Sequence, residues 1–523
     1  MVSDSEAARA AEHAMSLRDG LRLYPKAIAW SALLSLTLVM EGYDLAIVNG
    51  FFALPQFRRR YGKLTASSGY QISTKWQSAL TNGAVSGEII GLFANGIVTE
   101  AIGYRRTLII ALAFLCCSIF FAFFASHIWL LLISEILCGL SWGVFQTLST
   151  TYSTPEVMPV TLRAYLTSTV NLCWLLGQLV ALGVLRGTLS WPSQWSYRLP
   201  FGLQWVWAVP LLVAVSFAPE SPWFLVRKHR YDEARKSLAR LTKSGRGYKA
   251  DHTIAMMKHT DEVEKYLSPS RSYWDCFKGV DLRRTEIVCF VWMIQTLSGG
   301  PMTGYATYFF TSAGINDTLS FDLSFAMYGI AIFADILSFG LIRYFGRRTL
   351  YISGCCLMAT TLLIGGIIGT QPQTQGMSWA LGGLVVLTTF FYDCTVGPLC
   401  YALVSELAST RLRVKSITLA RVAYNVVGIV SNILMPKMVN PSAWNLKGKT
   451  CFVWAGTALA SALWCYFRLP EPKGLTYLEI DLLFQRKASA RKFREVQVHL
   501  ERAGYFEMRD ETEAEERWAG QYF

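Results

Sequence analysis

Charged residues are scarce in this chain: they make up 16% of its 523 residues, whereas a soluble domain usually carries about 25%. Histidine is rarer still, and none of the six histidines shows metal-ligand spacing near a cysteine. The twelve cysteines form no CxxC pair, and many stand inside apolar runs. These shortages argue against a metal centre and favour free cysteines as small apolar fillers.

What the chain has instead is apolar sequence: 52% of its residues are hydrophobic and 14% are aromatic. The length alone would allow three soluble domains, but segment 108–133 is almost uninterrupted apolar sequence. Such a run is too long for an amphipathic core helix and long enough to cross a bilayer. The first 26 residues are polar, so we expect no signal peptide and expect the first helix to start insertion.

Twelve segments each approach the ~20 apolar residues that a bilayer needs. They run over 27–50, 74–98, 107–126, 129–152, 163–186, 199–217, 285–312, 321–343, 349–369, 378–403, 413–438 and 450–467. We therefore predict an all-α membrane protein with twelve transmembrane helices in two six-helix bundles and a cytosolic helical insert. The expected division is an N-terminal segment at 1–26, bundles at 27–217 and 285–467, a linker at 218–284 and a C-terminal tail at 468–523.

The same charged pattern occurs in both halves. Glu156 and Arg163 stand seven positions apart, as do Glu406 and Arg413, and Glu406 follows Glu156 by 250 residues. A glycine-arginine loop and a Pro-Glu-containing segment also recur at matching places in the two halves. Loop signals at a fixed long offset indicate two copies of one membrane unit, which is a common plan of secondary transporters.

Lysine and arginine in the short loops predict the orientation. Most of them fall on one side, together with both termini, and that side should be the cytosol. The loop with Arg58, Arg59, Arg60 and Lys63 dissents, because it would lie outside. The net charge of +13 then reflects membrane topology, and its dispersal through loops argues against nucleic-acid binding.

The polar stretch 227–284 is rich in charged residues. Ala234, Leu238 and Leu241 recur at helical spacing within it, which predicts short amphipathic helices on the cytosolic face. The alternative is a flexible linker. Asn316 begins an N-glycosylation sequon in a short outer loop, and the sequence leaves open whether it is modified.

Ionisable residues inside the spans are the strongest functional signal, because each costs about 2.5–3.5 kcal/mol to insert and must face a partner or a water-filled cavity. A buried carboxyl holds its proton tightly, and a nearby arginine favours release. A static ion-pair network that fixes helix packing is the alternative, and Asp335 would lie nearer the cytosolic end, as a gate contact. The candidates for proton coupling are Glu41, Asp44, Glu88, Glu135, Asp393 and Arg421.

Charged residues at the cytosolic helix ends suggest a gate. Ion pairs between the halves would close that side in one state and break in the other, whereas simple positive-inside anchors would need no matched acids. The candidate gate residues are Arg105, Arg106, Glu156, Arg163, Glu220, Arg347, Arg348, Glu406, Arg413 and Glu471.

Amide, hydroxyl and aromatic side chains within the spans suit a sugar, because they bond its hydroxyls and stack on its faces. Asn171 and Gln178 are two helical turns apart on one face, and Gln295 precedes glycines and Pro301, which loosen the helix and free backbone groups. An isolated tyrosine in a membrane helix more often serves packing. The candidate sugar contacts are Asn171, Gln178, Gln295, Tyr305, Tyr401, Tyr424 and Asn425.

The ordered set of motifs resembles the sugar porter family of the major facilitator superfamily, most closely fungal maltose and α-glucoside permeases. The matching stretches include EGYDLAIVNGFFALPQF, EILCGLSWGVFQT, PESPWFLVRK, YDCTVGPLCYALVSE and STRLRVKS. The resemblance implies proton-driven sugar import by rocking of two six-helix bundles. It implies no cofactor beyond the proton gradient, a sugar and protons as partners in a lipid bilayer, a monomer, and the plasma membrane as location.

Within that resemblance, Asn171, Gln178, Gln295, Tyr305 and the region of Tyr424 and Asn425 match sugar-contacting positions, and Asp44 matches the first-helix proton acceptor. Some positions depart from the pattern. Glu135 stands where many sugar porters have an arginine, although glutamate is usual in the α-glucoside branch, and Tyr401 replaces a frequent tryptophan. The other departures are Thr296, Pro301, Arg343, Pro472 and Leu475, and Asp335 has no place in the pattern.

Other functions remain open on sequence alone. A facilitator, a porter for another sugar or polyol, or a sensor that binds sugar without moving it would carry similar spans. Sensors often add a long cytosolic tail, and the tail from about Lys487 is short, which favours transport.

Overall fold

A computed structural model describes residues 25–65, 69–151, 160–242, 251, 253–258, 273–371, 374–409, 412–441, 443–473, 475 and 477–493. The first half contributes six long helices: α3 (Pro25–Phe51), α5 (Thr74–Ile102), α6 (Tyr104–Phe123), α7 (Ile128–Thr151), α8 (Val160–Thr188) and α9 (Trp195–Ser216). Each covers one of the first six predicted spans, and the observed ends differ from the predicted ones by a few residues.

The second half supplies six more spans, two of which are interrupted. The unbroken ones are α16 (Asp317–Tyr344), α17 (Arg347–Ile368), α20 (Arg413–Val439) and α21 (Thr450–Arg468). The seventh span consists of α13 (Gly279–Leu297), α14 (Gly300–Gly304) and α15 (Ala306–Ser312), and the tenth of α18 (Gln375–Cys394) and α19 (Val396–Leu407). In the described residues, eleven helical segments qualify as membrane spans by length and composition, and the broken seventh completes the predicted twelve.

The break in the seventh span has a local cause. Gly299 adopts a left-handed backbone with φ of 110°, and Pro301 follows in the first turn of α14, where its missing N–H needs no partner. The sequence predicts loosening here, and the structure confirms it. Thr395 makes the second break, with φ of −133° and ψ of −80° between α18 and α19.

Small residues let helices within one half approach closely. A Cβ atom added to Gly87 of α5 would lie 2.2 Å from the carbonyl oxygen of Ile136 on α7, and one added to Gly177 of α8 would lie 2.0 Å from that of Val39 on α3. Such packing of small residues is how helices associate in lipid, where burial of apolar surface gives no advantage. It fixes α3, α5, α7 and α8 around the polar residues discussed below.

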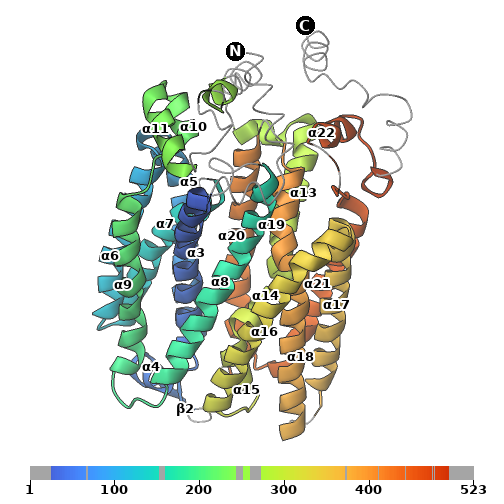
Figure 1. Cartoon of the computed structure of the whole chain (residues 1–523). Helices are drawn as coiled ribbons and strands as arrows, with labels where there is room; N and C mark the ends of the chain where they lie inside the picture. Colours follow the sequence, from blue (N-terminus) through green and yellow to red (C-terminus); the bar gives the residue numbers. More distant parts are fainter. Residues whose placement is uncertain are drawn as a thin grey trace.

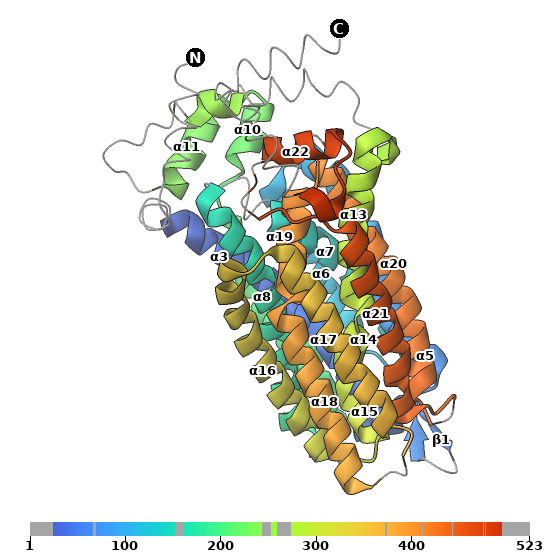
Figure 2. The ribbon, with the colours of Figure 1, turned by 90° about the vertical axis from the view of Figure 1, so that its right-hand side faces the viewer.

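The two halves meet mainly where α8 packs against α16 and α19 and where α5 packs against α20. At one end of the helical body, here called the linker end, lie α10 (Pro222–Arg227), α11 (Tyr231–Leu241) and α22 (Tyr477–Gln485) (Figures 1 and 2). The opposite end, here called the hairpin end, carries α4 (Pro55–Tyr61), α15 and the antiparallel pair β1 (Lys63–Thr65) and β2 (Gly69–Gln71) (Figure 1).

The described part of the linker contains short helices. Ala234, Leu238 and Leu241 are buried on one side of α11, and Ala234 and Leu238 pack with α10 in a small hydrophobic cluster. The structure thus bears out the predicted amphipathic helix over the residues of α11. The short 3-10 helices η1 (Tyr273–Phe277), η2 (Lys447–Lys449) and η3 (Ala490–Lys492) complete the described elements.

Candidate functional site

A cavity of about 210 Å³ lies between the two halves. Its walls come from α3, α5 and α8 on one side and from α13, α14, α16, α18 and α20 on the other. The lining is mostly uncharged and polar or aromatic, which suits a ligand with many hydroxyl groups. The polar and aromatic lining residues are Asn49, Thr81, Glu88, Asn171, Trp174, Gln178, Gln295, Thr296, Thr303, Tyr305, Tyr328, Tyr392, Asp393, Tyr424, Asn425, Ser431 and Asn432.

The structure brings six of the seven predicted sugar contacts to this cavity. These are Asn171, Gln178, Gln295, Tyr305, Tyr424 and Asn425. The seventh, Tyr401, packs edge-on against Trp292 with ring centroids 5.0 Å apart, and it is not part of the cavity lining that the described residues form.

The broken seventh span places two of these residues. Gln295 lies just before the break and donates from Nε2 to the carbonyl oxygen of Gly397 at 3.0 Å, next to the break in the tenth span. Tyr305 follows α14 and donates its hydroxyl to Thr81 Oγ1 of the first half at 3.3 Å. Both interruptions therefore face the cavity, as expected where irregular backbone at membrane depth lines a site.

The sequence reasoning missed Asn49 and Asn432, which also line the cavity. The side-chain oxygen Oδ1 of Asn49 is buried without a hydrogen-bond partner among the described residues. A buried acceptor of this kind costs free energy unless a ligand donates to it. An asparagine inside an apolar span was the available signal, because such a residue needs a partner within the protein or a ligand.

Arg421 is the buried cation beside the cavity. It extends from α20 of the second half, the residue is 6% exposed, and its Nε donates to Gln146 Oε1 of the first half. Three rings surround the guanidinium, with centroids at 4.6 Å for Tyr424, 4.7 Å for Trp292 and 5.5 Å for Trp174. Aromatic faces attract a desolvated cation, so the rings hold Arg421 in place without neutralising it.

Two predicted acids, Glu41 of α3 and Glu88 of α5, lie beside this cation. Gln146 donates from Nε2 to Glu41 Oε1, so one amide joins Glu41 to Arg421. Both carboxyl groups are buried, and each lies close enough to Arg421 to interact electrostatically with it. The acids belong to the first half and the cation to the second, so this cluster exists only where the halves meet.

Asp44, by contrast, lies in a separate polar cluster of the first half. Gln204 Nε2 donates to its Oδ1 at 2.6 Å, and Trp142 Nε1 donates to its Oδ2 at 3.2 Å. The Glu135 side chain is buried near it, with Oε2 unpartnered among the described residues. The sequence grouped Asp44 with Glu41 and Glu88, and the structure separates them.

Asp393 is not beside Arg421 either. Asn171 of α8 donates from Nδ2 to Asp393 Oδ1 at 3.2 Å and to Asp335 Oδ1 at 2.9 Å. The structure therefore places Asp335 beside Asn171 of the cavity wall, and its role as a gate contact stays a prediction.

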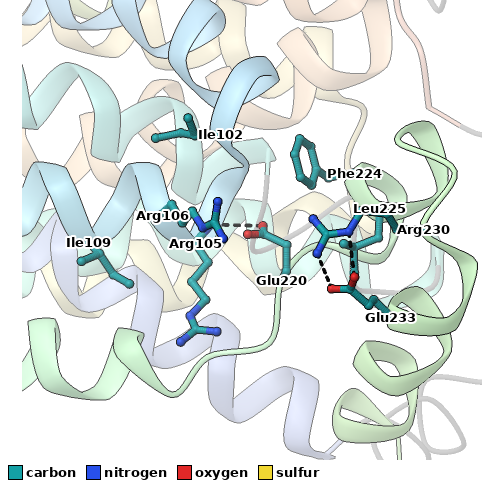
Figure 3. Close-up of a pocket in the computed structure, with 9 residues that line it drawn as sticks. All are labelled: Ile102, Arg105, Arg106, Ile109, Glu220, Phe224, Leu225, Arg230 and Glu233. Atoms are coloured by element: carbon teal, nitrogen blue, oxygen red, sulfur yellow. Dashed lines mark hydrogen bonds and ion pairs between the residues drawn. The ribbon is translucent and has the colours of Figure 1, made fainter.

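At the linker end, the carboxylate of Glu220 caps the start of α6. Its Oε1 accepts from the backbone N–H groups of Tyr104 at 3.0 Å, Arg105 at 3.1 Å and Ser221 at 3.1 Å. Burial raises the pKa of Glu220 above the usual carboxyl value, and the backbone donors act in the opposite direction. A second cavity of about 360 Å³ lies here, with Glu220, Arg105 and Arg106 in its wall (Figure 3).

The second half repeats this cap. Glu471 accepts from the backbone N–H groups of Arg347 at 2.9 Å and Arg348 at 3.1 Å, at the start of α17. Negative charge at a helix N-terminus is favourable because it meets unpaired N–H groups and the positive end of the helix dipole. In each half, the recurring glutamate thus caps the helix that begins at the glycine-arginine loop.

The remaining gate candidates are placed as follows. Arg347 Nη2 lies 3.4 Å from Glu406 Oε1, and both residues belong to the second half. Arg413 begins α20. Glu156 lies outside the described residues, as does the side chain of Arg163 in α8. The cap and ion-pair contacts described here each join residues of one half, so a gate between halves stays a hypothesis.

Replacing Gly103 with alanine is expected to destabilise the protein by about 1–3 kcal/mol, because a side chain is strained at such backbone angles. Gly103 has φ of 95°, and a Cβ atom there would lie 2.8 Å from Glu220 Oε2. Thermal unfolding in detergent measures the effect. Gly96→Ala in α5 is the matched control, since nothing lies within 4 Å of its added Cβ atom. Equal melting temperatures for the two variants would contradict the strain expected at Gly103.

Ion pairs join the two halves at the hairpin end. Arg58 Nη2 of α4 lies 3.2 Å from Asp317 Oδ2 of α16. Arg186 Nε of α8 lies 2.5 Å from Asp322 Oδ1, which also belongs to α16. Asn440 Nδ2 also donates to the carbonyl oxygen of Ile72 at 3.3 Å across the halves. The hairpin end is therefore bridged in this structure.

Two six-helix halves, a polar cavity between them and buried charges at their interface define a multi-pass membrane transporter. The chain matches the family model described as "Sugar (and other) transporter" over residues 30–484. It therefore belongs to the sugar transporter family.

Relatives and solved structures agree with this placement. The chain is 41% identical to the maltose permease MAL31 of Saccharomyces cerevisiae over 505 residues, covering 95% of this chain and 82% of the relative. It is also 41% identical to the alpha-glucosides permease MPH3 of S. cerevisiae strain YJM789 over 506 residues, covering 95% and 84%. Among solved structures, the proton:xylose symporter XylE bound to 6-bromo-6-deoxy-D-glucose matches with a TM-score of 0.72 at 21% identity, covering 88% of this chain and 99% of that one.

Proposed function

We propose that this protein imports an α-linked glucoside such as maltose together with protons. The observation that carries the proposal is Arg421 of the second half, held beside Glu41 and Glu88 of the first half at the edge of the cavity. The names of the permease relatives supply the sugar class. These relatives are permeases, so the chain is a transporter and not an enzyme.

Sugar binding would draw on donors and acceptors from both halves. Asn49 offers an unpartnered acceptor, Gln178 an amide in the first half, and Gln295 an amide in the second half. At about 210 Å³ the cavity is smaller than the ~300 Å³ of small drug-sized sites. A disaccharide therefore requires the halves to move apart, which is what alternating access provides.

Proton coupling would follow from the same movement. A buried carboxyl beside a cation favours its ionised form, and one without a cation favours its protonated form. When the halves open to the outside, Arg421 withdraws from Glu41 and Glu88, and a proton binds in its place. When the halves open to the cytosol, the cation returns and the proton is released on that side.

For orientation, we propose that the linker end faces the cytosol, with both termini on that side, in a plasma-membrane monomer that needs no cofactor. The candidate gate arginines lie at this end. The basic loop at 58–63 does not fit this orientation by charge. Its position outside is partly explained, because Arg58 is paired with Asp317 and Arg60 Nη2 donates to the carbonyl oxygen of Ser126. We propose residues 27–217 and 285–467 as the two moving bodies.

Uptake of labelled maltose into cells lacking their own permeases tests the proposed function, with a panel of α-glucosides, hexoses and polyols in parallel. The expected result is accumulation of an α-glucoside above its external concentration that collapses when a protonophore is added. Equilibration without accumulation would indicate a facilitator. Binding without uptake would indicate a sensor and overturn the proposal.

A more specific result is expected for Asn49→Ala. The variant loses one acceptor for sugar hydroxyls, which should raise the KM for uptake about 5-fold or more, the equivalent of a hydrogen bond worth about 1 kcal/mol. Initial rates over a range of sugar concentrations measure it. Ser31→Ala is the control, since Ser31 is a buried polar residue of the same helix that does not line the cavity. An unchanged KM for Asn49→Ala would remove Asn49 from the sugar site.

A further inference from the structure

We propose that Asp335 and Asp393 form a second proton-binding site, separate from the Glu41–Glu88–Arg421 cluster, which takes up one shared proton in each transport cycle. The inference rests on the proposed function and adds to it a second proton per sugar. Its basis is a pair of buried acids at the wall of the cavity, joined by an amide from the opposite half.

The contacts define the pair. Asn171 Nδ2 carries two hydrogens, and it reaches Asp335 Oδ1 at 2.9 Å and Asp393 Oδ1 at 3.2 Å. Asp335 is 0% exposed and Asp393 is 1% exposed. Two charged carboxylates this close, both removed from water, repel each other strongly, and two acids at one site commonly share a proton for this reason.

A second feature independently points to a missing positive partner. Asp335 Oδ2 is buried and has no hydrogen-bond partner among the described residues. Asp393 stands in the last turn of α18, immediately before the break at Thr395, where the negative end of the helix dipole disfavours a second negative charge. Broken helices at mid-membrane commonly hold the coupling ion of secondary transporters.

Among the described residues, the groups that face the pair do not supply a cation. They are the thiols of Cys173 on α8 and Cys394 on α18, and the phenols of Tyr328 on α16 and Tyr392 on α18. All four groups are ordinarily neutral near pH 7. Arg421 contacts Gln146 and three rings elsewhere at the interface, and it is not among the groups that act on either aspartate.

The chemistry favours a proton over a metal ion. The amide of Asn171 turns its N–H donors toward both carboxyl groups, and a donor between two carboxylates occupies the place that a sodium ion would need. Within the described residues, no group of three or more His, Cys, Asp or Glu side chains could hold a metal. A proton needs only one carboxyl oxygen.

The pair is placed to link proton binding to movement of the halves. Asp335 and Asp393 belong to the second half and Asn171 to the first, across the contact between α8 and α16. Asp393 and Asn171 line the cavity, so a proton reaches the pair through it. Opening of the halves to the outside breaks the amide bridge and lets the pair take up its shared proton from water, and opening to the cytosol lets that proton leave.

Purified protein in proteoliposomes tests the proposal. The sugar gradient that just balances an imposed potential and pH difference gives the number of protons per sugar. The parent protein is expected to give two, and Asp335→Asn, Asp393→Asn and the double variant are each expected to give one. Loss of one proton lowers the maximal accumulation about fifty-fold at about 100 mV. Asp232→Asn, at an aspartate whose side chain is 92% exposed on α11, should keep the parent ratio.

The outcomes separate the two ideas. A parent that accumulates sugar with one proton overturns the inference and leaves the proposed function standing, and this measurement needs no variant. Single variants that keep the parent ratio overturn it as well, as does a double variant that loses two protons, since the site would not be shared. Accumulation that follows a sodium gradient would show that sodium is the coupled ion, and it would overturn the inference. A parent that accumulates no sugar overturns both. Counterflow exchange by the variants confirms that they are folded.

Discussion

Replacing Glu88 with glutamine is expected to lower the steady-state accumulation of sugar about fifty-fold at a membrane potential of about 100 mV, while sugar exchange persists. One proton crossing 100 mV supplies about 2.3 kcal/mol, and each 1.4 kcal/mol is tenfold in a concentration ratio. Glutamine keeps the shape and hydrogen bonding of Glu88 but cannot release a proton. Glu88 is 3% exposed and lies beside Glu41 and Arg421.

Net uptake and counterflow, measured on the same cells, separate coupling from sugar binding. Glu41→Gln should behave in the same way, and the double variant should lose little more than either single one, because both acids serve one cation. Glu100→Gln in the same helix α5 is the control, since Glu100 is exposed. Full accumulation by Glu41→Gln and Glu88→Gln, at unchanged pH dependence, would make these acids structural.

Asp44 lies in a different polar cluster from Glu41 and Glu88. The resemblance to sugar porters assigns Asp44 to proton binding, whereas the structure places it with Gln204, Trp142 and Glu135 in the first half. Its bonds to two neutral donors do not depend on the position of the second half.

Helix positions were predictable because the bilayer imposes them. A span of about 20 apolar residues has few alternatives in lipid, where every backbone polar group needs an internal partner. The interrupted seventh span was also readable from Gly299 and Pro301, because both residues have strong backbone preferences. The break at Thr395 has a similar signal, because Gly397 and Pro398 follow it in the first turn of α19, yet the sequence analysis predicted one continuous helix there.

Partners of the buried charges were less predictable, because partners come from helices whose rotation the sequence does not specify. Glu41 and Asp44 are three residues apart on one face of α3. Even so, Gln146 donates a hydrogen bond to Glu41, whereas Gln204 donates one to Asp44. The Asp335–Asn171 contact joins residues 164 positions apart in the chain. Periodicity indicates which side of a helix is polar, but only packing shows which polar groups meet.

The sequence correctly showed that the capping glutamates recur in the two halves, but it did not predict their bonds to backbone N–H groups. The sequence showed that Glu220 and Glu471 stand in matching Pro-Glu segments of the two halves, and it suggested ion pairs between the halves. The structure shows each carboxylate bonding to backbone N–H groups of its own half. Side-chain charge is visible in a sequence, whereas a bare helix N-terminus, which attracts the same carboxylate, becomes visible only in the fold.

Reversing the charge of Arg58 is expected to open the hairpin end. Arg58 is 12% exposed and pairs with Asp317 across the two halves, so Arg58→Asp sets two negative charges against each other in a partly buried place. An ion pair of this burial and the repulsion that replaces it amount to about 1–2 kcal/mol, which changes the ratio of the two conformations about tenfold.

A cysteine introduced at Val85, which lines the cavity, reports the shift through its reaction with a membrane-impermeant thiol reagent added outside. Arg58→Asp should raise that reaction rate about tenfold, and combining it with Asp317→Arg should return the rate toward the parent value. Arg59→Asp is the control, because Arg59 is exposed on the same short helix. A rate that Arg58→Asp leaves unchanged, or that the double reversal fails to restore, would show that this ion pair does not hold the halves together.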